Sequence, residues 1–273
     1  MSDELHVVLG ATGGIGRALV HALAGRGHRV RAVSRTGGGD IPAGVESVTA
    51  DVGTPGGARA ACAGAALVYH CAQPAYHRWA QEFPALNEAV VGGAADAGAK
   101  LVFADNLYMY APPDGPLTED APQRPTSRKG TVRWALADRL LTAHQAGHLR
   151  VAIGRASDYY GPGATLSTAG ETVFDAVLAG RTVRWPGRVD VPHTLHHVDD
   201  IARGLITLGE RADADGQAWI LPAAAALTPR EFVERVGVAA GRPGRISGTP
   251  KLLLRLLGTV NKAAGQLPDI WYR

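Results

Sequence analysis

Cysteine is scarce in this chain of 273 residues, with Cys62 and Cys71 as the two examples. Their spacing is not that of a CxxC pair, and no cluster of metal-ligating side chains accompanies them. A disulfide framework is therefore excluded, and we expect reduced thiols and no bound metal.

Long apolar runs and one-sided charge are lacking as well. No stretch approaches the 18 apolar residues of a membrane span, and the first residues lack the layout of a signal peptide. Lysine and arginine number 28 against 25 acidic residues, and no run of five cations occurs. We therefore expect a cytoplasmic protein with a small-molecule substrate and neither nucleic acid nor membrane as a partner.

The chain does have a regular alternation of short apolar runs and longer helical patterns over its first 155 residues. Several of the runs are almost entirely apolar, which is typical of parallel strands covered on both faces. This alternation predicts an α/β fold with a doubly wound parallel sheet of the Rossmann type. The expected strands are Leu5–Leu9, Arg29–Ser34, Val45–Thr49, Ala66–Cys71, Lys100–Ala104 and Leu149–Gly154, and the expected helices are Gly14–Ala24, Pro55–Ala63, Ala75–Ala97 and Thr126–Ala146.

The pattern changes after Arg155, where glycine and proline become dense. A helix is predicted at Val198–Leu208, a capping box at Thr228 and Glu231, and an amphipathic stretch at Lys251–Ala264. We interpret residues 1–155 as a dinucleotide-binding domain. Residues 156–273 are interpreted mostly as a substrate-side lobe, with segments that return to the main sheet.

A glycine-rich run, GATGGIG, joins the first predicted strand to the first helix. Glycine is needed where the backbone turns sharply, approaches a pyrophosphate, or packs a helix against a strand. The helix N-terminus then offers free N–H groups to the anion. The predicted cofactor contacts in this run are Gly10, Thr12, Gly13, Gly14, Ile15 and Gly16.

The end of the second predicted strand indicates which dinucleotide binds. This strand ends on Ser34 and is followed by Arg35 and Thr36, and no carboxylate occurs there before Asp40. Because a planar guanidinium suits a 2′-phosphate, we expect NADP(H) in preference to NAD(H), with Ser34 and Arg35 as contacts. The remaining expected cofactor contacts are Asp51, Val52, Cys71 and Ala72, at the ends of the third and fourth strands.

Taken together, these motifs resemble the short-chain dehydrogenase/reductase superfamily, close to its extended, epimerase/dehydratase-like branch. The resemblance covers nearly the whole chain. It is carried by GATGGIG at 10–16, Asp51–Val52, His70–Cys71–Ala72, Leu86–Asn87, FADNLYMYAP at 103–112, GRASDYYGPG at 154–163 and LHHVDDIARGL at 195–205. In that superfamily a homodimer through a helix pair is common, and the resemblance leaves a homodimer open for this chain.

The catalytic residues that this resemblance implies are replaced. The family's Ser or Thr, four residues before a tyrosine, corresponds to Asn106 when counted from Tyr110. The family's Tyr-x-x-x-Lys pair corresponds to Lys129 and Arg133. Lys129 could act as an acid, Arg133 could hold ribose hydroxyls, and Asn106 could orient a carbonyl. The alternative interpretation is that Lys129 and Arg133 are solvated cations on the surface.

Other side chains could donate a proton or contact substrate. Tyr108 and Tyr110 follow the fifth strand, Tyr159 and Tyr160 the sixth, and strand ends line the crevice of such folds. We prefer Tyr108 as the substitute acid. The expected substrate contacts are Tyr110, Tyr159, Tyr160, Trp185 and His193. Rim packing is the alternative for the tyrosines, and packing at a hinge is the alternative for Trp185.

Three functions remain open from the sequence. The first is an NADP(H)-dependent oxidoreductase acting on a small or medium carbonyl or hydroxyl compound. A short second half without an obvious diphosphate-binding cluster argues mildly against nucleotide sugars. The second is a redox-neutral epimerase, dehydratase or cyclase, and the third is a protein that senses NADP(H) without turnover.

Overall fold

A computed structural model describes residues 4–111 and 115–250 in two units. Of the described residues, the first unit comprises 4–111, 115–156 and 198–222, and the second comprises 157–197 and 223–250. The predicted helix at Lys251–Ala264 lies outside the described residues. Within those residues, no helix is both long and apolar enough to cross a membrane.

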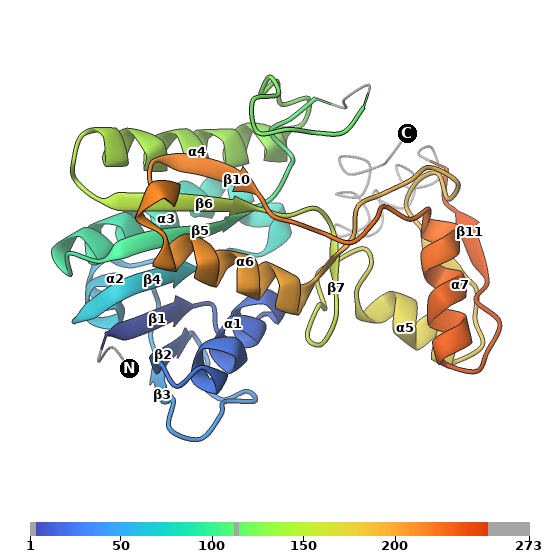
Figure 1. Cartoon of the computed structure of the whole chain (residues 1–273), viewed down its shortest axis with the longest axis horizontal. Helices are drawn as coiled ribbons and strands as arrows, with labels where there is room; N and C mark the ends of the chain where they lie inside the picture. Colours follow the sequence, from blue (N-terminus) through green and yellow to red (C-terminus); the bar gives the residue numbers. More distant parts are fainter. Residues whose placement is uncertain (1–3, 112–114, 251–273) are drawn as a thin grey trace. The chain divides into compact units, whose positions relative to one another are not determined.

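A seven-stranded parallel sheet forms the centre of the first unit (Figure 1). Its order, β10-β6-β5-β4-β1-β2-β3, places β1 inside, with β4 on one side and β2 on the other. This reversal of strand order creates the crevice in which doubly wound folds bind ligands. The strands are β1 (Leu5–Leu9), β2 (Arg29–Ser34), β3 (Glu46–Thr49), β4 (Ala65–His70), β5 (Lys100–Asp105), β6 (Arg150–Arg155) and β10 (Gln217–Ile220).

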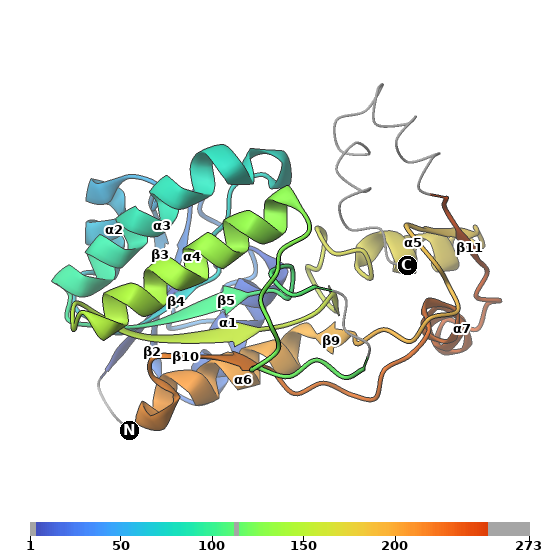
Figure 2. The same ribbon diagram turned by 90° about the horizontal axis from the view of Figure 1, so that it is seen from above.

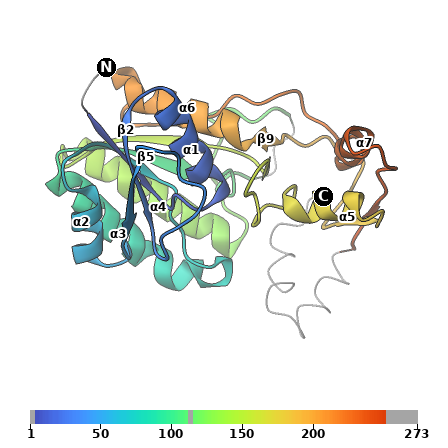
Figure 3. The same cartoon turned by 90° about the horizontal axis from the view of Figure 1, so that it is seen from below.

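Helices cover both faces of this sheet. α2 (Pro55–Cys62), α3 (Trp79–Asp96) and α4 (Arg128–Gln145) lie on one face (Figure 2). α1 (Gly14–Gly25) and α6 (Val198–Glu210) pack against each other on the opposite face (Figure 3). The central strands β1, β4, β5 and β6 are almost fully buried because both faces are covered. The predicted Rossmann-type fold is confirmed.

Two helices begin later than predicted, α4 by two residues and α3 by four. The sequence suggests a helix over Ala75–Ala97, whereas residues Tyr76–Arg78 form a 3₁₀ turn, η1, before α3 begins at Trp79. The indole of Trp79 donates a hydrogen bond to the carbonyl of Pro74 at 3.2 Å, which fixes the chain at this entry. Pro84 lies inside α3, where it donates no N–H to the helix.

A buried lysine attaches the returning segment 198–222 to the sheet. Lys100, at the start of β5, donates to the carbonyls of Leu208 at 2.6 Å and Arg211 at 2.7 Å and forms an ion pair with Asp215. These carbonyls belong to the end of α6 and the residue after it. A lysine near a helix C-terminus satisfies orphan carbonyls and complements the helix dipole. A short 3₁₀ turn, η2 (Ala212–Ala214), then leads to β10.

The second unit has a small core of its own. α5 (Glu171–Leu178) and α7 (Pro229–Ala239) pack over paired β8 (Val183–Trp185) and β11 (Ile246–Gly248), around Trp185 and Phe232. β7 (Tyr159–Tyr160) pairs with β9 (His196–His197). The capping box is present: Thr228 accepts from the Glu231 N–H, and Glu231 accepts from the Thr228 N–H.

Two buried histidines make stability depend on pH. Burial, with a contribution from His28, lowers the pKa of His6 to about 4, and burial lowers the pKa of His70 to about 3. Both therefore stay neutral when folded, whereas an unfolded chain protonates them near pH 6.5. The unfolded state binds more protons between about pH 6.5 and pH 4, so stability falls as the pH drops through this window.

We therefore expect the fall in unfolding free energy between pH 7 and pH 5 to be smaller in His6→Gln than in wild type, by about 2 kcal/mol. Urea unfolding at the two pH values measures this difference. Equal losses in the two proteins would show that His6 does not remain neutral in the folded state.

Candidate cofactor and catalytic site

The glycine-rich loop passes through a narrow space between strand ends. Gly10 has φ +82°, and a Cβ there would lie 2.7 Å from the backbone nitrogen of Ala72. The N–H groups of Gly10 and Ala11 both donate to the carbonyl of Val33, each at 3.0 Å. A Cβ on Gly16 would lie 2.2 Å from the carbonyl oxygen of Gly10. The backbone geometry therefore requires glycine at both positions.

The N-terminus of α1 has no side-chain cap within the described residues. This is also so for α3 and α5, whereas Thr54, Ser127 and Thr228 cap α2, α4 and α7. The N-cap residue, Gly13, is exposed, and the nearest atom to a Cβ on it would be the Gly10 oxygen at 3.5 Å. N–H groups of a first helical turn without a side-chain cap fit a pyrophosphate, so these residues fit a dinucleotide cofactor. Gly14 and Gly16 are buried below this surface, Ile15 is half-buried, and Thr12 is exposed.

The other expected cofactor contacts lie at neighbouring strand ends. Ser34 ends β2, and Arg35 after it is exposed. Asp51 follows β3 and accepts from the Gly53 N–H at 3.0 Å, while Val52 is buried. The N–H of Cys71 donates to the Leu9 carbonyl at 2.9 Å, which places Cys71 and Ala72 beside the glycine-rich loop.

The thiol of Cys71 is a neutral group. Burial raises its pKa to about 12, so the group stays protonated near neutral pH. Cys71 is thus a small neutral side chain beside the loop, and its contact with a dinucleotide stays a prediction.

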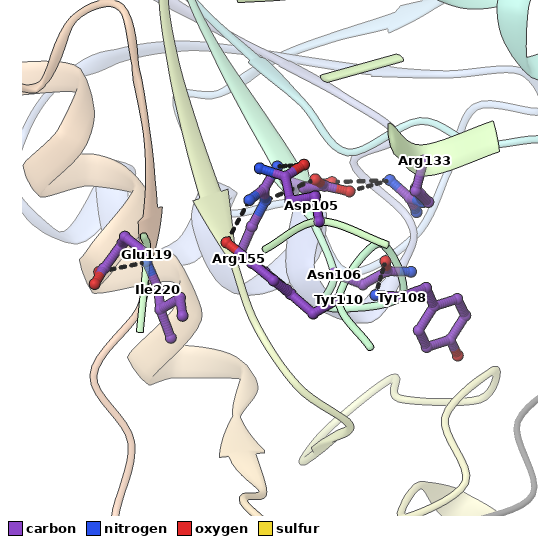
Figure 4. Close-up of polar contacts among 10 residues, drawn as sticks. Asp105, Asn106, Tyr108, Tyr110, Glu119, Arg133, Arg155 and Ile220 are labelled. Atoms are coloured by element: carbon purple, nitrogen blue, oxygen red, sulfur yellow. Dashed lines mark hydrogen bonds and ion pairs between the residues drawn. The ribbon is translucent and has the colours of Figure 1, made fainter. Parts of the chain in front are cut away.

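A buried carboxylate at the end of β5 joins two arginines (Figure 4). Asp105 lies 3.4 Å from Nη1 of Arg133 and 3.3 Å from Nε of Arg155, and none of these side chains is more than 6% exposed. Burial raises the pKa of Asp105, and the two guanidinium groups oppose that rise. With two cations in contact, we assign the ionised form to this carboxyl group.

Both arginines make further contacts. Arg133 donates to Oε1 of Gln73 at 3.2 Å, and its guanidinium lies 4.4 Å from the ring centre of Trp79. Arg155 donates to the Tyr110 hydroxyl at 2.5 Å and to Gln123 at 3.4 Å. Arg133 is therefore held in the interior by charge, hydrogen bonding and an aromatic face, and it is not a solvated surface cation.

This network changes the interpretation of Tyr110. The sequence suggests a substrate contact, but Tyr110 is 7% exposed and its hydroxyl is bonded to Arg155. Its backbone also forms a bridge with Gln123. Tyr110 thus stabilises the buried ion network and the loop that returns from β5.

Three of the predicted catalytic residues lie close together with one that the sequence analysis missed. Lys129, buried at the start of α4, places Nζ 4.1 Å from the ring centre of Tyr76. The Tyr76 hydroxyl lies 3.4 Å from the Tyr108 hydroxyl, and Asn106 accepts from the Tyr108 N–H at 3.1 Å. In Figure 4 the ring of Tyr108 points away from the ion network.

Tyr76 could have been found by the same rule that selected Tyr108. It belongs to η1, which follows the carboxyl end of β4, and side chains after strand ends line the crevice of such sheets. The expected helix over Ala75–Ala97 concealed this, because it placed Tyr76 within a regular helix.

The remaining predicted residues belong to the second unit. Trp185 is 1% exposed and lies in the core of this unit. It is therefore a packing residue and not a substrate contact. Tyr159 and Tyr160 are half-buried, and the Tyr160 ring packs on Phe232 with centroids 5.2 Å apart. Nε2 of His193 lies 3.1 Å from Oδ2 of Asp158.

The parallel sheet and the glycine-rich loop together define a dinucleotide-binding protein of the Rossmann class. A model of the NAD dependent epimerase/dehydratase family matches residues 6–221. The chain belongs to this family, which confirms the resemblance to the extended branch of the superfamily. A search of the curated proteins found no match.

Solved structures of epimerases and dehydratases share the fold. UDP-glucose 4-epimerase of Thermus thermophilus, in complex with NAD, is 22% identical with a TM-score of 0.74, over 90% of this chain and 86% of the other. The DesIV dTDP-glucose 4,6-dehydratase double mutant of Streptomyces venezuelae, with NAD bound, is 20% identical with a TM-score of 0.76, over 90% and 84%. UDP-N-acetylglucosamine 4-epimerase of Bacillus cereus is 14% identical with a TM-score of 0.77, over 98% and 100%.

The ion network yields a stability prediction. Asp105→Asn removes the buried negative charge that both guanidinium groups contact, so we expect a loss of about 3–5 kcal/mol in the free energy of unfolding. Denaturant titration measures the loss. Asp96→Asn is the matched control, because Asp96 pairs with Arg59 at the surface, and it should cost less than about 1 kcal/mol. Equal effects of the two substitutions would contradict the importance given to Asp105.

Proposed function

We propose that this protein is a nicotinamide-dinucleotide enzyme of the epimerase or dehydratase type, with a reaction that is redox-neutral overall. The observation that carries the proposal is the cluster of Asn106, Tyr108, Lys129 and Tyr76 in the same unit as the open glycine-rich loop. The cluster retains side chains able to move a proton, although the family's Tyr-x-x-x-Lys pair is replaced. The nicotinamide cofactor, when bound, supplies hydride transfer to and from a carbon of the substrate.

Tyr108 is the proposed proton donor and acceptor toward the substrate oxygen. Its backbone is fixed by Asn106, and its hydroxyl lies next to that of Tyr76. The Lys129 ammonium over the Tyr76 ring places positive charge beside the pair, which favours negative charge on a phenol oxygen as its proton leaves. Tyr76 and Lys129 therefore support proton transfer at Tyr108, and Lys129 is the alternative donor.

Asn106 and Arg133 have positioning roles in this proposal. The Asn106 amide orients the substrate carbonyl. Arg133 is proposed to hold the nicotinamide ribose, directly or through Gln73, which it already contacts at 3.2 Å. Its own protons stay bound, because an arginine side chain remains charged.

The proposed cofactor is NADP(H). Support comes from Arg35, an exposed guanidinium directly after β2, and from residues 34–36, which carry no carboxylate. NAD is named in the two complexes above, and it is the alternative for this chain. The other proposed cofactor contacts at the strand ends are Ser34, Asp51, Val52, Cys71 and Ala72.

The proposed substrate carries a hydroxyl or carbonyl carbon, with sugar nucleotides as the first class to test. The similar structures are named for UDP- and dTDP-sugars. We give this similarity more weight than the short second half of the chain, which argued mildly against nucleotide sugars. Tyr159, Tyr160 and His193 remain proposed substrate contacts. The second candidate is an oxidoreductase that consumes or produces NADPH. Arg35 favours this candidate, because its guanidinium suits the 2′-phosphate of NADP(H).

The proposed reaction is tested by incubating the cofactor-loaded protein with UDP-glucose and dTDP-glucose. We expect a changed sugar by NMR with no net change in reduced-nicotinamide absorbance. Tyr108→Phe should lower kcat by about a hundredfold or more and leave cofactor affinity unchanged, since it removes one proton donor. Tyr69→Phe, a buried tyrosine paired with His6, is the control and should retain activity. Net loss of absorbance would favour the oxidoreductase, and cofactor binding without conversion would favour a sensor.

The cofactor preference is tested separately with Arg35→Glu. The reversed charge should weaken NADPH binding by about tenfold or more and NADH binding by less than about threefold, because NADH lacks the 2′-phosphate. Fluorescence titration with both cofactors measures this. An equal effect on both, or none, would exclude Arg35 as a phosphate ligand.

A further inference from the structure

A short loop after β2 folds back over the glycine-rich loop. Gly37, Gly38 and Gly39 have φ values of +66°, +71° and +97°, a run that residues with a Cβ rarely adopt. A Cβ on Gly39 would lie 3.3 Å from Cγ2 of Thr12, and one on Gly37 would lie 2.7 Å from Oγ1 of Thr49. The chain from Arg35 to Asp40 is therefore short, tightly turned and adjacent to the proposed cofactor contacts.

The loop ends on a carboxylate held by two side chains of α1. Arg17 forms an ion pair and hydrogen bond with Oδ2 of Asp40. Nε2 of His21, one helical turn further on, lies 3.3 Å from the same oxygen and 3.0 Å from the Asp40 carbonyl oxygen. The hydrogen bond from Arg17 lowers the pKa of Asp40, so this carboxyl group is ionised at neutral pH.

Arg17 and His21 thus form an anion site whose occupant is part of the chain itself. Arg35, at the other end of the same loop, is exposed and forms no ion pair within the described residues. A phosphomonoester offers three acceptor oxygens and more negative charge than a carboxylate, and guanidinium groups bind it well. An exposed ion pair contributes little free energy, so a phosphate can displace Asp40 at small cost.

We propose that Arg17, His21 and Arg35 form a phosphomonoester site for the 2′-phosphate of NADP(H), and that Asp40 competes with the phosphate for it. This inference rests on the proposed function, because it concerns the cofactor of the same site. NADP(H) must release Asp40 from Arg17 and His21 to bind, whereas NAD(H) leaves the pair in place. Asp40 is then the residue that limits the preference for the phosphorylated cofactor.

The alternative role for Asp40 makes the opposite prediction. A carboxylate after the second strand holds the ribose hydroxyls in NAD-binding folds. If Asp40 did this, its removal would weaken NADH. Under competition, its removal strengthens NADPH and leaves NADH unchanged.

The test compares NADPH and NADH titrations of the full chain, wild type and Asp40→Asn. Asp40→Asn should tighten NADPH by about three- to tenfold and change NADH by less than about twofold. Arg17→Gln should weaken NADPH by about tenfold, and adding Asp40→Asn to it should give no gain, because the competition acts through Arg17. Asp96→Asn, which removes another exposed carboxylate paired with an arginine, should change neither affinity.

A second probe removes the nicotinamide from the measurement. Adenosine 2′,5′-bisphosphate should bind more tightly to Asp40→Asn than to wild type, and adenosine 5′-monophosphate should bind both equally. Two results would overturn the competition: weaker NADH binding by Asp40→Asn, or NADPH and bisphosphate affinities that do not change. Neither result would contradict cofactor binding itself. Failure of the wild type to bind either dinucleotide would overturn both this inference and the proposed function.

Discussion

The ion pairing of Asp105 with Arg133 and Arg155 is the interaction on which the candidate site depends. It joins the end of β5 to α4 on one side and to the end of β6 on the other, in the interior. Removing one partner from such a network leaves an uncompensated charge, so its members constrain one another. The backbone that carries Asn106 and Tyr108 follows Asp105 directly, so the network holds the residue from which this segment starts.

The register predicted from the sequence assigns Arg133 and Lys129 to the family's lysine and tyrosine. Arg133 is held by Asp105, Gln73 and the Trp79 ring. Lys129 lies over Tyr76, whose hydroxyl lies next to that of Tyr108. The proton-transferring groups in our proposal thus come from three separate segments, whereas the family pair lies on one helix.

Much of the fold could be predicted because parallel strands buried on both faces have a continuous apolar pattern. The glycine-rich loop was equally predictable, since Gly10 and Gly16 occupy positions where a Cβ would meet backbone atoms. The 3₁₀ turn at Tyr76–Arg78 was not, because its residues are compatible with a helix and the Trp79 contact decides where α3 begins. The burial of Tyr110 was also unpredictable, because Arg155 is 45 residues away in the sequence.

The sequence by itself determined the fold, the family and the place of the dinucleotide loop, because these depend on local periodicity and on glycine at fixed spacing. It also drew attention to Asn106, Tyr108, Lys129 and Arg133 through their register against the family pattern. The tertiary structure decided which of these side chains meet, that Tyr76 joins them, and that Asp40 lies against Arg17 and His21. Such contacts join segments far apart in the chain, and the burial and charge that create them exist only once the chain is folded.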